Sequence, residues 1–110
     1  TGYGSFWDRL ASAACFIDFG FEGKSPGPNC KIVDPLRVGC PVVADGESFS
    51  HYLLSKHDMG EVVTYRHPYA MARAIERQSA KPRDRAKCAA DFVAVEGWRA
   101  RCRNLARYAR

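Results

Sequence analysis

The residues of this chain best suited to bind a ligand lie in one short segment, Asp34 to Pro41. Asp34 precedes Gly39 by five positions, and Pro41 opens the aliphatic run Val42-Val43-Ala44. An acid at the start of a short apolar helix, a glycine where that helix stops and a proline at a strand entry place the carboxylate at the rim of an α/β crevice. This is the geometry of a ligand site, and the ligand that such a crevice favours is a nucleotide. The alternative role for an acid at this position is that of a helix cap.

The loop before that segment, Gly20 to Asn29, is suited to hold phosphate groups. Its ten residues include three glycines and two prolines, a composition typical of a loop. Anions bind at helix N-termini beyond the carboxyl ends of the strands in open α/β sheets, because unpaired N–H groups point at them there. The expected phosphate ligands are the backbone amides around Ser25, Gly27 and Asn29, with Lys24 or Lys31 adding positive charge.

Short apolar strands alternate with helices through the first part of the chain, and they must position these residues. The predicted strands are Cys15–Phe19, Pro41–Ala44 and Gly60–Tyr65. The predicted helices are Ser5–Ala14, about Cys30–Val38 or a shorter one beginning near Asp34 with Pro35 in its first turn, Ser48–Ser55, and one opened by His67-Pro68-Tyr69. Strands that are apolar on both faces and joined by helices predict a parallel sheet covered on both faces. The expected fold class is therefore α/β, with a Rossmann-like sheet and flanking helices.

The chain becomes wholly helical after Lys81-Pro82-Arg83, with an interruption at Gly97. Phe92 and Val95 share one apolar stripe of these helices; a second stripe holds Trp98, Cys102, Leu105 and Ala109. We therefore divide the chain into a Rossmann-like portion, residues 1–80, and a helical extension, residues 81–110, which packs on the same or on a partner domain.

The positive charge belongs to the C-terminal part of the chain. The net charge of the 110 residues is +5. Residues 73–110 hold eleven Lys and Arg against four Asp and Glu, a net +7, whereas residues 1–72 hold six against eight, a net −2. A basic helical end could meet nucleic acid, an anionic membrane surface or an acidic partner, and a solvated helix face is the simpler alternative.

Composition excludes several classes of protein. With 46% hydrophobic and 26% charged residues, the chain is typical of globular proteins, and no apolar run is long enough to span a bilayer. The cysteines are odd in number and lack the spacing of zinc or redox sites, so we expect them to be reduced and mostly buried, in a cytoplasmic protein without bound metal. They are Cys15, Cys30, Cys40, Cys88 and Cys102.

Taken with its flanks, the segment around Asp34 resembles the nucleotide-sugar-binding motif of GT-B glycosyltransferases, in the retaining families related to sucrose and glycogen synthases. The resemblance extends from about residue 10 to residue 108 through further motifs in the same order. These are Asp45-Gly46-Glu47-Ser48 after the strand, Gly60-Glu61-Val62-Val63 as the next strand, Tyr69 to Ile75 as the helix that follows, and Trp98-Arg99-Ala100-Arg101-Cys102 as the closing helix.

The resemblance implies a role for particular residues. An acid five residues before the glycine binds the ribose hydroxyls of the donor in this family; it is more often Glu, and Asp34 stands there in this chain. A further Glu often lies eight residues earlier, near the sugar or the phosphates, where this chain has Pro26, and Glu22 is the nearest acid. The donor would be a nucleoside-diphosphate sugar of the UDP or GDP type, used without a cofactor or metal ion.

The leading hypothesis is that the chain is the donor-binding part of a glycosyltransferase of the hexosyltransferase kind, incomplete alone. The acceptor domain would lie before it or in a partner chain, because 110 residues are too few for the two facing domains of a GT-B enzyme. The alternative is a non-catalytic α/β binding module whose basic helical tail meets nucleic acid or an acidic partner, and a degenerate glycosyltransferase domain is a third possibility. His51, His57 and His67 form no constellation with a nucleophile and are expected to be structural or surface residues.

Overall fold

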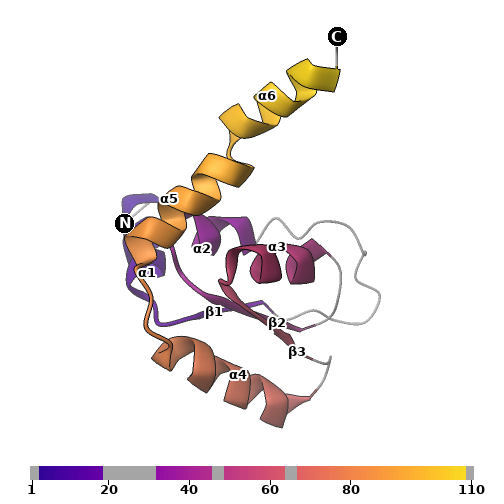
Figure 1. Cartoon of the computed structure of the whole chain (residues 1–110). Helices are drawn as coiled ribbons and strands as arrows, with labels where there is room; N and C mark the ends of the chain where they lie inside the picture. Colours follow the sequence, from indigo (N-terminus) through magenta and orange to yellow (C-terminus); the bar gives the residue numbers. More distant parts are fainter. Residues whose placement is uncertain (1–2, 19–31, 46–48, 64–66, 109–110) are drawn as a thin grey trace.

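A computed structural model of the 110-residue chain describes residues 3–18, 32–45, 49–63 and 67–108. The described strands form a three-stranded parallel sheet in the order β1-β2-β3 (Figure 1). In chain order the elements are α1 (Tyr3–Ser12), β1 (Phe16–Asp18), α2 (Val33–Arg37), β2 (Val42–Asp45), α3 (Phe49–His57), β3 (Gly60–Val63), α4 (Pro68–Ala80), α5 (Arg85–Glu96) and α6 (Trp98–Tyr108). The α/β class and the parallel sheet with flanking helices are as predicted.

The helices cover both faces of the sheet. Figure 1 shows α2, α3 and α5 on one face and α4 on the other. Side chains alternate along a strand, so Val42 and Val43 of the central strand point to opposite faces. Val42 belongs to the larger apolar cluster and Val43 to a smaller one with Met71 and Ala74 of α4. A central strand buried on both sides is what its aliphatic sequence predicts.

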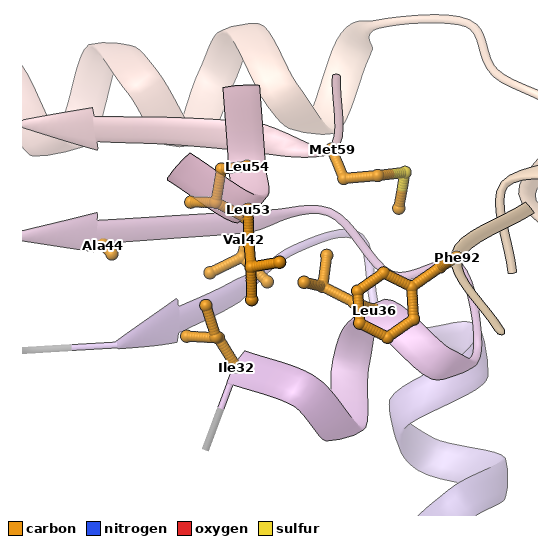
Figure 2. Close-up of a cluster of buried hydrophobic side chains, with 8 residues drawn as sticks. All are labelled: Ile32, Leu36, Val42, Ala44, Leu53, Leu54, Met59 and Phe92. Atoms are coloured by element: carbon orange, nitrogen blue, oxygen red, sulfur yellow. The ribbon is translucent and has the colours of Figure 1, made fainter. Parts of the chain in front are cut away.

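The larger cluster is the main core, and it unites residues from α2, β2, α3 and α5 (Figure 2). Its members are Ile32, Leu36, Val42, Ala44, Leu53, Leu54, Met59 and Phe92. The ring of Phe92, which is 3% exposed, lies beside Leu36. Burying one such side chain contributes about 1.5–3 kcal/mol. The expected boundary near residue 81 thus falls before a helix, α5, that contributes to the core.

Of the two predicted lengths of helix α2, the structure shows the shorter one. It begins at Val33, so Pro35 lies in the first turn, where its missing N–H costs nothing. At the other end, the N–H of Cys40 donates to the carbonyl of Pro35 at 2.9 Å, and Gly39 has a φ of 77°. This left-handed glycine closes the helix, as its position in the sequence predicts.

Helix α4 is fixed to β3 by Glu61. The Glu61 carboxylate accepts hydrogen bonds from Arg77 Nη2 at 2.7 Å and from Gln78 Nε2 at 2.8 Å. The hydrogen bonds from Arg77 are the largest cause that holds the pKa of Glu61 below its ordinary value. Because the folded pKa is the lower one, the pair stabilises the protein above the ordinary pKa of glutamate, about 4.3, and this stabilisation is lost as pH falls through the folded pKa.

We expect Glu61→Gln to lower the melting temperature by a few degrees at pH 7, and the difference from wild type to shrink below about pH 4. The effect is modest because the Arg77 side chain is 59% exposed and solvent screens the pair. Thermal unfolding followed by circular dichroism from pH 3 to pH 7 measures it. Glu76→Gln is the matched control, because Glu76 is exposed on α4, the helix that carries Arg77. A difference that stays constant down to pH 3 would contradict the assignment.

The C-terminal helices differ in how they meet the body. In α5 the Asp84 side chain accepts a hydrogen bond from the Lys87 N–H at 3.1 Å as an N-cap, and Gly97 separates α5 from α6 as predicted. Helix α6 extends away from the sheet (Figure 1). Among the described side chains of α6, that of Ala100 is buried. The predicted second apolar stripe is therefore not in the core: Trp98 is 77% and Leu105 66% exposed.

Cysteine burial is lower than predicted. The four described cysteines are free thiols, but only Cys40 is buried, Cys15 and Cys88 are half-buried and Cys102 is exposed. Burial raises the pKa of the Cys40 thiol, and burial followed by the neighbouring Cys40 raises that of Cys15, so both stay protonated at neutral pH. Neither of these two thiols is suited to act as a nucleophile.

Among the described residues, no helix is both long and apolar enough to cross a bilayer.

Candidate functional site

The predicted phosphate loop cannot be located, because residues 19–31 lie outside the described part of the chain. Six predicted site residues fall there: Glu22, Lys24, Ser25, Gly27, Asn29 and Lys31. Asp34 is the predicted site residue that the structure describes.

Asp34 is positioned by the burial of its neighbours. Leu36, which is 0% exposed, and the buried Pro35 turn toward the sheet and hold α2 against the core. Asp34 is thereby directed along the side of the helix, half-buried, at the end of α2 that the chain reaches after β1. Figure 2 shows Ile32, which directly precedes α2, beside Val42 at the start of β2, with Ala44 farther along the strand. Helix α2 therefore starts alongside the strands, and the place of Asp34 at the rim of a crevice stays a prediction.

Asp34 is not the N-cap of α2. The N-cap position is held by Ile32, which makes no side-chain capping hydrogen bond, and Asp34 is the second helical residue. Asp34 makes no hydrogen bond or ion pair with another described residue. The capping alternative therefore does not account for Asp34.

The Asp34 side chain lines an open groove of about 470 Å³ between α2 and the junction of α5 with α6. This volume lies within the range of small-molecule sites, about 300–1,000 Å³. The lining residues are Val33, Asp34 and Arg37 from α2, Phe92, Val93 and Glu96 from α5, and Gly97, Trp98 and Arg101 beyond it. Apolar walls with a few charged groups are typical of ligand sites.

The charged groups of the groove differ in how far they are already engaged. Glu96 binds α3: its carboxylate lies 3.2 Å from Lys56 Nζ and 3.7 Å from His57 Nε2. The guanidinium of Arg101 donates through Nε to the carbonyl of Glu96 at 3.1 Å. Asp34 is thus the groove carboxylate that has no partner among the described residues.

The two arginines retain donors for an anion. Arg37 lies over the ring of Trp7, 5.8 Å from its centre, and Arg101 uses only Nε in its bond to the α5 carbonyl. A guanidinium presents five N–H donors in a planar fork that matches phosphate oxygens. A carboxylate and two guanidinium groups in one groove can together accept from a diol and donate to a phosphate.

Four residues of the groove were missed in the sequence analysis: Arg37, Glu96, Trp98 and Arg101. Trp98 and Arg101 belong to the motif of the closing helix, but nothing in the order of the motifs places that helix beside α2. The available signal was Gly97, because a glycine break directly before a tryptophan marks a turn at which the ring can reach a neighbouring helix.

The described histidines do not form a catalytic group. Nδ1 of His67 accepts a hydrogen bond from the Ala70 N–H at 3.1 Å and caps α4. The ring of His57 packs edge to face on Phe92 at 5.1 Å. The structural role predicted for these two residues is confirmed, and the side chain of His51 lies outside the described part. Within the described ranges, no group of three or more His, Cys, Asp or Glu could hold a metal ion.

Comparison of the chain with protein-family models, with curated proteins and with solved structures finds no match. The inference of function therefore rests on the residues and on their arrangement.

Proposed function

We propose that this chain is the donor-binding part of a glycosyltransferase, which moves a sugar from a nucleoside diphosphate of the UDP or GDP type to an acceptor hydroxyl held by another domain or chain. The observation that carries the proposal is Asp34, half-buried and without a partner among the described residues, in a groove that also holds two arginines. The order and spacing of the motifs in the sequence support the same function.

The groove residues have distinct roles in this proposal. The Asp34 carboxylate accepts hydrogen bonds from the two ribose hydroxyls, since two acceptor oxygens match a vicinal diol. Arg37 or Arg101 donates to the diphosphate, and the undescribed loop before α2 adds backbone amides. The open side of the groove leaves room for the acceptor.

The transfer step balances with these components. The acceptor oxygen forms a bond to the anomeric carbon of the sugar, and the bond between that carbon and the diphosphate oxygen breaks. The electron pair leaves with the nucleoside diphosphate, whose added charge the arginines stabilise. The proton of the acceptor hydroxyl passes to the departing diphosphate oxygen, so that atoms and charge balance.

We expect Asp34→Asn to weaken the binding of UDP or GDP by about 10- to 100-fold, because a hydrogen bond to a charged group contributes about 1.5–3 kcal/mol. Isothermal titration of the 110-residue chain measures the dissociation constants. The same titration with the 2′,3′-dideoxy form of the nucleotide tests the diol directly: wild type should prefer the ribose form, and Asp34→Asn should lose this preference.

Asp91→Asn is the matched control, because Asp91 lies on α5 and pairs with Lys87, away from the groove lining. Equal affinity of wild type and Asp34→Asn for both sugar forms would refute the role of Asp34 in donor binding.

The alternative function, a non-catalytic α/β binding module, is favoured by the exposure of α6, which carries four arginines. The titration separates the two functions. A folded chain that binds no nucleoside diphosphate at all would favour the binding module.

A further inference from the structure

Helix α6 presents an apolar seam to solvent. Trp98 and Leu105, 77% and 66% exposed, lie on this seam with the exposed Cys102 between them. The helix is held to the body at its first turn, by the buried Ala100 and by the hydrogen bond from Arg101 to Glu96. An isolated helix of eleven residues is marginal in water, so α6 gains stability from a surface that covers this seam.

The spacing of the seam fits a helical partner. Trp98, Cys102 and Leu105 are four and then three residues apart, the a and d spacing of two helices that pack along each other. Arg99 and Arg101 occupy the flanking e and g positions beside Trp98. In such pairs the a and d side chains supply contact, and the e and g charges choose the partner.

The charge of α6 restricts the occupant. The eleven residues Trp98–Tyr108 contain four arginines and no acid. A second copy of the chain would oppose arginine with arginine, which is destabilising. Duplex nucleic acid would engage the arginines but leave Trp98 and Leu105 in water, and a bilayer surface needs a broader apolar face than a single seam.

We propose that α6 is a docking site for an acidic amphipathic helix of a partner protein, whose apolar residues cover Trp98 and Leu105 and whose carboxylates pair with the flanking arginines. This helix-on-helix mode buries the seam and neutralises the arginines together. It rests on α6 and needs no bound donor, although Trp98 and Arg101 also line the donor groove, so a docked helix would lie beside it.

The test uses the 110-residue chain and two synthetic three-heptad peptides, both with leucine at a and d. One carries glutamate at e and g, and the other carries lysine. Fluorescence anisotropy should show the acidic peptide binding about tenfold tighter than the basic peptide, with an affinity that falls as salt rises. Glutamate at e and g also keeps the acidic peptide from pairing with itself at neutral pH.

Two variants make the test specific to the seam. Arg99→Glu reverses the charge at the e position beside Trp98 and should remove most of the tenfold preference for the acidic peptide. Leu105→Ala removes apolar contact and should weaken binding of both peptides. These side chains are exposed, so circular dichroism of the variants should match wild type.

Three outcomes would overturn the proposal. The first is a folded chain that binds the two peptides equally or not at all. The second is a stable dimer in sedimentation that Leu105→Ala dissociates, which would make a second copy the occupant. The third is binding to duplex DNA, or to vesicles of phosphatidylserine and phosphatidylcholine, that displaces the acidic peptide and withstands Leu105→Ala.

Discussion

Replacing Leu36 with alanine is expected to lower the free energy of unfolding by about 3 kcal/mol. Leu36 is 0% exposed and lies in the core cluster, between the sheet and α5. The substitution removes the transfer free energy of the lost atoms and leaves a cavity that the sheet on one side and the Phe92 ring on the other prevent from closing. The total free energy of unfolding of such a domain is about 5–15 kcal/mol, so the expected loss is a large part of it.

Urea unfolding followed by circular dichroism measures this loss. Leu105→Ala is the matched control, because it makes the same chemical change at a side chain that is 66% exposed. We expect the control to change the free energy of unfolding by less than about 0.5 kcal/mol. Similar losses for the two variants would mean that α2 does not pack as described, and the placement of Asp34 would fail with it.

Replacing Gly39 with alanine is expected to lower the free energy of unfolding by about 2–4 kcal/mol. The φ of Gly39 is 77°, in the left-handed region that residues with a Cβ atom rarely adopt. A Cβ at this position would also meet the backbone carbonyl oxygen of Arg85, which cannot move as freely as a side chain. The helix end and the approach of α5 both require glycine at this position.

Gly4→Ala is the control for this change. Gly4 lies in α1, and a Cβ there meets no atom within 4 Å. Alanine is the better helix former, so we expect Gly4→Ala to be neutral or to stabilise the protein by up to about 1 kcal/mol. The melting temperature should therefore fall for Gly39→Ala and stay the same or rise for Gly4→Ala. A Gly39→Ala variant as stable as wild type would show that α2 ends differently.

The sequence predicts the fold well where local chemistry decides it. Gly39 and Gly97 stop helices at the expected places, and His67 with Pro68 opens α4. The aliphatic run at Val42 forms a strand because both faces of the sheet are covered. Each of these features depends on residues close together in the chain.

The features that the sequence did not predict depend on how distant segments meet. Trp98 and Leu105 have the spacing of a buried face, yet they are exposed because α6 leaves the body at Gly97. Periodicity shows that a helix has an apolar side but not whether anything covers it. The groove is a similar case, because Arg101 and Asp34 are far apart in sequence and meet only where the α5–α6 junction lies over α2.

Asp34 is the predicted site residue that the structure describes, and it lines the groove between α2 and the α5–α6 junction. Its role in ribose binding stays a prediction, as do those of the six predicted site residues between positions 19 and 31, outside the described part of the chain. Donor binding is therefore the claim that most needs measurement.

An amide-shift NMR titration of the 110-residue chain with UDP, GDP and ADP tests that claim most directly. We predict saturable shifts for one nucleotide in Val33 to Arg37 and in Gly97 to Arg101, the two sides of the groove, and their loss in Asp34→Asn. A folded chain in which none of the three nucleotides shifts these residues, or in which Asp34→Asn leaves the shifts unchanged, would contradict donor binding in this groove.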